Sequence, residues 1–107
     1  MTELISADSM EWQDHPTEAG VKTKLLALVP DRKLRFRLDR IAEKGLAEHS
    51  HPNGHILFVL SGHGTIWIED AGNLELSAGN LITIPPDLRH SIIDVAEPVE
   101  ILSIATL

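Results

Sequence analysis

The chain contains no cysteine among its 107 residues. This absence excludes disulfide bridges, thiolate metal ligands and a cysteine nucleophile. Any metal site in this protein must therefore be built from histidine, aspartate or glutamate side chains.

Long hydrophobic runs are also missing. No segment approaches the roughly 18 consecutive apolar residues that a membrane-spanning helix needs. Acidic side chains interrupt the apolar stretches of the N-terminal part, so a secretory signal peptide is not expected. These side chains are Glu3, Asp8, Glu11 and Asp14. We therefore expect a cytoplasmic protein with no membrane partner.

Positive charge is scarce, and the formal net charge is −7. A chain of this charge is a poor candidate for binding nucleic acid, whose phosphates require a basic patch. Basic residues concentrate in one segment only, at Arg32, Lys33, Arg35, Arg37 and Arg40. We interpret them as the solvated face of one strand; the alternative is a patch that recruits an anionic substrate.

What the chain does contain is a succession of short strand-like segments. Residues 33–41 alternate cleanly between apolar and charged side chains, the period of a β-strand. Further strands are expected at residues 22–29, 55–60, 65–69, 74–76, 81–84, 91–95 and 99–105. Turn-forming residues recur roughly every ten residues and no segment predicts a helix, a pattern typical of an all-β sandwich or barrel. One domain spanning residues 1–107 is expected, with residues 1–20 covering a sheet edge or a partner subunit.

Three of the six histidines fall in one short segment, His49-Ser50-His51-Pro52-Asn53-Gly54-His55. Alternate residues of a strand point to the same face, so His49 and His51 should point the same way. The turn formers between His51 and His55 let the chain swing back, so that His55 can face the other two. His90 follows a second turn, at Pro85-Pro86-Asp87. Since neutral imidazole is the commonest metal-ligand group, we predict that these four histidines bind one divalent transition metal ion inside a small barrel.

The alternative for these histidines is a surface cluster satisfied by local hydrogen bonds. The spacing of the run, which closes one strand and opens the next, favours the metal site. His63 lies between two glycines and is expected to be exposed to solvent, and His15 shows no sign of a partner. Trp67 sits in an apolar run and is interpreted as a core residue.

These residues resemble the two sequence motifs of the cupin family. The first motif is matched by Gly45, His49-Ser50-His51, His55 in the place of a glutamate, and Gly62. The second is matched by Gly79, Pro85-Pro86-Asp87, His90 and Asp94. The resemblance covers residues 45–94 and implies a single-domain cupin, a double-stranded β-helix also called a jelly-roll β-barrel.

The chain departs from these motifs at four positions. Gly45 lies two residues closer to the histidines than is usual, Asp87 replaces a glycine, and Asp94 replaces an asparagine. The most consequential departure is His55, because it replaces the family's carboxylate ligand and gives a four-histidine set. Asp94 is interpreted either as a group that orients a ligand histidine or as an exposed carboxylate at a strand end.

The resemblance implies a metal-dependent protein that acts on a small organic molecule, and an enzyme of dioxygenase-like oxidoreductase type is the favoured interpretation. Four neutral ligands leave the ion's charge uncancelled, so its open positions are expected to take water, O₂ or an anionic substrate oxygen. The six-coordinate geometry common in the family implies two such positions. The ion is expected to be Fe, Mn, Ni, Zn or Cu, and no catalytic side chain is identified. The alternatives are a non-redox isomerase or lyase acting on a sugar acid of the uronate type, and a non-catalytic small-molecule-binding module. Single-domain cupins usually pair, so a homodimer is also expected.

Overall fold

The computed structural model describes residues 2–107, and all of its strands join in one antiparallel sheet. The strands are β1 (Gln13–Asp14), β2 (Val21–Val29), β3 (Leu34–Ile41), β4 (Leu46–His49), β5 (His55–Ile68), β6 (Gly72–Ser77), β7 (Leu81–Ile84) and β8 (His90–Thr106). Short 3-10 turns, η1 (Ala7–Ser9) and η2 (Pro30–Arg32), complete the regular structure. The predicted all-β jelly-roll fold is thus confirmed. Neither helical turn of this described chain has the length or apolar character needed to cross a membrane.

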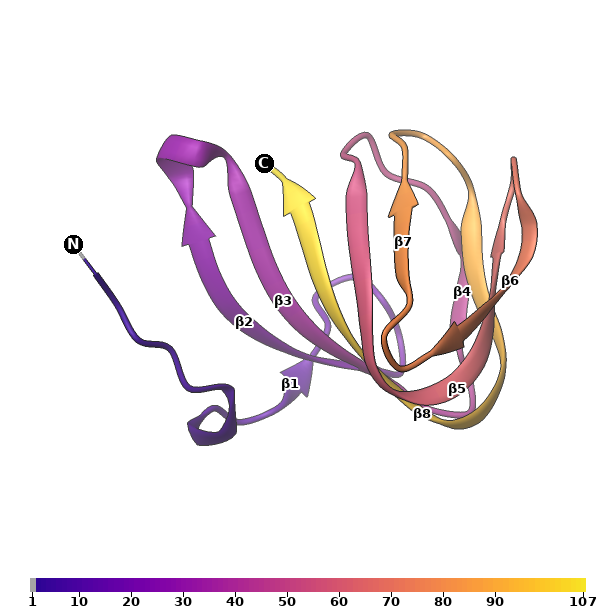
Figure 1. Cartoon of the computed structure of the whole chain (residues 1–107), viewed down its shortest axis with the longest axis horizontal. Helices are drawn as coiled ribbons and strands as arrows, with labels where there is room; N and C mark the ends of the chain where they lie inside the picture. The colour runs from indigo at the N-terminus through magenta and orange to yellow at the C-terminus, as the bar shows by residue number, and fades with distance from the viewer. Residues whose placement is uncertain (1) are drawn as a thin grey trace.

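The sheet runs in the order β1-β2-β3-β8-β5-β6, with β4 added to β8 and β7 added to β5. Figure 1 shows how β5 and β8 curve along the bottom of the molecule and rise on its other side, so that the sheet wraps around an interior. The core inside this wrap is formed by branched aliphatic side chains, among them Val59, Ile66 and Val99, each fully buried.

The sequence predicted two strands where the structure has the single strand β5. Ser61–Gly64, expected to be a turn, instead lies within β5, where the pairing with β8 shifts register three times between Val59 and Thr65. Such bulges bend a strand without ending it. β8 likewise continues through the break expected around Pro98. Because of these bends, β5 and β8 each contribute to both sides of the barrel. Alternation of apolar and polar residues does not reveal such bends.

Strand β3 presents its charged face to the interior, and its apolar residues lie on the other face, where Leu38 is nevertheless buried. Ile41, which has the same parity as Arg35, Arg37 and Asp39, belongs to the buried core, whereas Phe36 does not. The interpretation of these basic residues as a solvated strand face is therefore wrong for Arg35, whose side chain lines an interior cavity. Alternation shows that a strand has two different faces, but not which of them faces inward.

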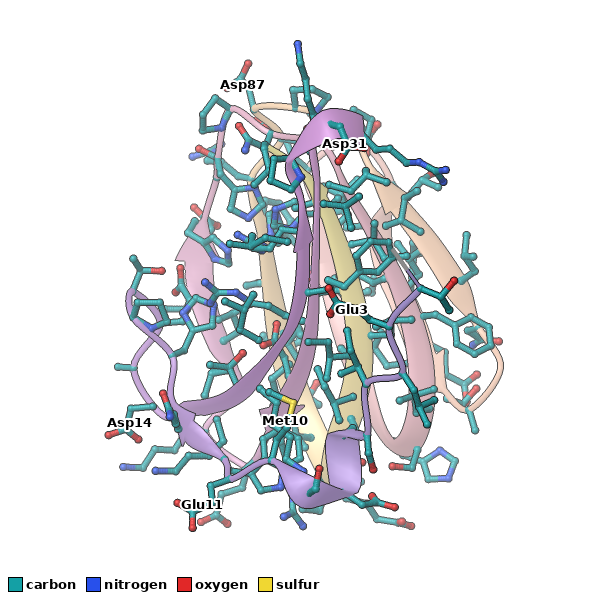
Figure 2. All side chains as sticks on the ribbon, turned by 90° about the vertical axis from the view of Figure 1, so that its left-hand side faces the viewer. Glu3, Met10, Glu11, Asp14, Asp31 and Asp87 are labelled. Carbon is teal, nitrogen blue, oxygen red and sulfur yellow. The ribbon has the colours of Figure 1, made fainter. Side chains whose placement is uncertain are left out.

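The N-terminal segment lies against the outside of the sheet. Lys24 donates a hydrogen bond from Nζ to the carbonyl of Ala7 (2.8 Å), and its ammonium lies 4.6 Å from the centroid of the Trp12 ring. Trp12 therefore lies against part of strand β2. Figure 2 places Met10, Glu11 and Asp14 at one end of the molecule, and Asp31 and Asp87 at the opposite end.

Candidate metal centre

Three of the four predicted histidines converge in the interior. His49 ends β4 and His90 begins β8, and the two are directly paired across these strands. His51 lies just beyond the end of β4, in the loop that leads to β5. Each of the three offers a ring nitrogen, and these nitrogens lie within 4.8 Å of one another. In the described chain, these three histidines form a group that could hold a metal ion.

Backbone carbonyls orient the three imidazoles. His49 Nδ1 donates to the carbonyl of Ala47 (2.8 Å), His90 Nδ1 to that of Leu88 (3.0 Å) and His51 Nδ1 to that of Asn53 (3.3 Å). A carbonyl can only accept a hydrogen bond, so each ring carries its proton on Nδ1 and leaves the Nε2 lone pair free. The donor set therefore fits a divalent transition metal bound through three Nε2 atoms.

Burial favours the neutral form of two of these rings. It lowers the pKa of His51 and of His90, and the neighbouring imidazoles lower it further, while backbone hydrogen bonds act in the opposite direction. A lowered pKa favours the neutral imidazole, which is the form that binds a metal. His90 is the most deeply buried of the three, with 2% of its surface exposed.

His55 lies beside this group but outside it. Its ring stacks on that of His51, with centroids 3.9 Å apart and an interplanar angle of 23°. Burial is the main cause that lowers the pKa of His55 to about 3, and His51 is the next. His55 lines the same cavity as the other three. Its role as a fourth ligand therefore stays a prediction.

Variants of His55 separate a ligand role from a stacking role. We expect His55→Ala to weaken metal binding without abolishing it, because three imidazoles remain. His55→Glu should be gentler and should shift the preference towards harder ions such as Mn, since a carboxylate can ligate from this position. His55→Phe keeps an aromatic ring against His51 and removes the nitrogen. Anaerobic titration of all four proteins with Mn, Fe, Ni and Zn measures these effects; a wild-type affinity in His55→Phe would reduce His55 to a stacking residue.

The cavity in front of the imidazoles has a volume of about 290 Å³. Leu57, Ile66, Ile92 and Ile101 contribute apolar walls, and Ser103 is among its polar residues. The cavity thus combines apolar walls with a large number of convergent polar side chains, which can orient a small ligand.

Several polar residues of this cavity were not identified from the sequence. Glu18 precedes β2, and its Oε1 lies 3.8 Å from His49 Nε2. His15 helps to position that segment, because its Nδ1 accepts hydrogen bonds from the backbone N–H groups of Thr17 (3.2 Å) and Glu18 (3.1 Å). Asp39 accepts a hydrogen bond from Thr23 (2.7 Å), and burial raises its pKa. No local motif marks these residues, since they reach the site only through the pairing of β1, β2 and β3.

The remaining predictions have mixed outcomes. Asp94 is exposed and has a left-handed backbone (φ 49°), and backbone carbonyls fill the orienting role considered for it. His63 is exposed as predicted, although it lies in a strand. Asp87, at the position of the motif's glycine, has a φ of 67°, and its N–H donates to the carbonyl of His51 (2.8 Å). The second motif's turn is therefore hydrogen-bonded to the loop that carries His51.

Comparison with known families agrees with this geometry. The family model described as "Cupin domain" matches residues 40–105, more than half of the chain. The chain belongs to the cupin family. This cupin is similar over its whole wrap to the solved structure of KdgF from Halomonas sp., with a TM-score of 0.81, 20% identity, and coverage of 97% of this chain and 94% of that one.

Similar sequences include the acireductone dioxygenases of two Bacillus species. The protein of Bacillus subtilis is 27% identical over 92 residues, which cover 82% of this cupin and 51% of the relative. That of Bacillus cereus is 35% identical over 92 residues, covering 82% of this cupin and 53% of the relative. The cupin thus spans about half the length of these relatives.

Proposed function

We propose that this cupin is a metal-dependent, dioxygenase-like enzyme acting on a small organic molecule. The observation that carries the proposal is the group of three Nε2 donors, His49, His51 and His90, at the wall of a cavity of about 290 Å³. The similarity to acireductone dioxygenases supports the oxidative form of the proposal. A bound ion would supply a Lewis-acidic centre able to polarise substrate oxygens and to bring substrate and O₂ together.

The chain's own residues would bind and orient the substrate. The aliphatic walls would shield part of a bound substrate from water, which strengthens electrostatic interactions with it. The carboxylate of Glu18 would accept a proton at Oε1 from a substrate bound in front of His49. Because the Nδ1 hydrogen bonds hold the three imidazole rings in place, the rings would need little reorientation to bind a metal ion.

Oxygen consumption tests the proposal directly. The protein is loaded in turn with Fe, Mn, Ni, Zn and Cu, then mixed with an acireductone, the substrate named in the relatives. We expect O₂ uptake with at least one redox-active ion and none with Zn. Turnover under anaerobic conditions would instead favour an isomerase or lyase, and binding without turnover would favour a binding module.

A homodimer and a cytoplasmic location complete the proposal. Support for the dimer comes from the outer face of the sheet, where Phe36, Ile104, Ile56 and Phe58 lie on paired strands outside the buried core. Ile56 is 42% exposed and the neighbouring Leu81 59%. A second copy of the chain would remove this apolar surface from water.

A further inference from the structure

Arg35 is brought to the cavity by strand pairing. It lies on β3 directly opposite Ala105 of β8, and Ala105 in turn lies opposite His55 of β5. Residues paired in this way point to the same face of a sheet. Ala105 thus lies between Arg35 and His55 in the sheet, and both of these larger side chains line the cavity.

The guanidinium of Arg35 has no anionic partner in the described chain. The ion pairs found among residues 2–107 involve Lys22, Arg40, His49 and Arg89 instead. Arg35 Nε is buried and has no hydrogen-bond partner among those residues. A buried donor without a partner is costly, and native proteins usually satisfy such groups.

The charged side chains around Arg35 are of both signs, with Arg37 nearby and Asp39 and Glu18 lining the same cavity. Burial and the nearby Arg37 lower the pKa of Arg35, whereas Asp39 acts in the opposite direction. Asp39 lines the same cavity but directs its carboxylate to Thr23, and Glu18 lies beside His49. Arginine stays protonated even in buried sites. The cationic fork of Arg35 therefore lines the cavity that contains the imidazole group, and neither carboxylate of that cavity pairs with it.

We propose that Arg35 is a specificity-determining residue that binds a carboxylate of the substrate. The substrate class is then a small organic acid with a metal-binding head, such as neighbouring oxygens, and a carboxylate at its other end. Arginine suits this task because its planar fork donates two parallel hydrogen bonds to a carboxylate. The inference rests on the metal site of the proposed function and further specifies that the substrate is an anion.

Hydroxamates test this inference without turnover. Acetohydroxamate carries only the metal-binding head, and a second series adds a carboxylate through a methylene chain of varied length. A third series ends in the isosteric, uncharged carboxamide. Their affinities for the nickel-loaded full chain are measured by calorimetry. For the best chain length, we expect the carboxylate to bind about tenfold to a hundredfold more tightly than the carboxamide, the range set by hydrogen bonds to charged groups.

Variants assign this preference to one side chain. Arg35→Gln should abolish it while leaving nickel content and acetohydroxamate affinity unchanged, and Arg35→Lys should restore part of it. Arg40→Gln is the matched control, because Arg40 lies on the same strand, faces outward and pairs with Glu100. A carboxylate preference that is absent in the wild type, or that persists in Arg35→Gln, overturns the inference. Failure of acetohydroxamate itself to bind would overturn the metal site, and the role of Arg35 with it.

Discussion

Replacing His90 with alanine is expected to lower the affinity for a divalent metal by more than about a hundredfold. Loss of an outer hydrogen-bonding partner of a ligand already costs about 10–100-fold, and His90 is itself a predicted ligand. It is also the most buried member of its group and the only one contributed by β8. His55 is not expected to replace its Nε2, because the His55 ring is stacked on His51.

Competition with a chromogenic chelator measures this loss. His63→Ala is the control. His63 is exposed, lies in β5 and does not line the cavity that contains His90. A native-state ligand raises stability by mass action, so added metal should raise the melting temperature of the wild type and of His63→Ala, and much less that of His90→Ala. Equal metal affinities in wild type and His90→Ala would remove His90 from the site.

The second large effect is expected at Gly62, where β5 bends. Gly62 has a φ of 92°, and a Cβ built there would overlap the carbonyl oxygen of Pro98 and lie 2.7 Å from Val99 Cα. Neither contact is with a flexible side chain, so β5 and β8 would have to separate. We expect Gly62→Ala to lower the free energy of unfolding by at least about 3 kcal/mol, from backbone strain and overpacking together.

Gly72→Ala isolates the steric part of this effect. Gly72 also has a positive φ, of 74°, but a Cβ there would meet nothing within 4 Å. Only the strain of the left-handed conformation remains, on the order of 1 kcal/mol. Urea unfolding of the two variants and the wild type measures both values. Similar losses in the two variants would show that β5 and β8 are not held as closely as the structure has them.

Local sequence patterns predicted the parts of this protein that depend on local geometry. The spacing of His49 and His51, and the turn before His90, placed these histidines in one group because strand parity and turn chemistry act over a few residues. Arg35 was misassigned because its strand alternates equally well with either face inward. That choice is made by the pairing of β3 with β8, which joins segments far apart in the chain.

Glu18 was missed for a related reason. It belongs to a segment with no regular pattern, and it reaches His49 only because β1 and β2 extend the sheet beside β3. The length of β5 was likewise misjudged, since the glycines at 62 and 64 signal a turn in sequence but permit a bulge within a continuous strand. Each error concerns long-range pairing rather than local preference.

Strand β4 is joined to the rest of the sheet only by its short pairing with β8. Its registered pairs with β8 are Leu46 with Ile92 and His49 with His90, and an irregularity separates them. Sparsely paired segments open at a lower free energy than the strands around them. Separation of β4 from β8 would move His49 and His51 away from His90. The three predicted ligands therefore lie together only while the two strands are paired. An ion bound by these histidines would cross-link segments about 40 residues apart in the chain. Metal occupancy and the slowing of amide hydrogen exchange in β4 would then both measure the equilibrium between paired and separated β4 and β8.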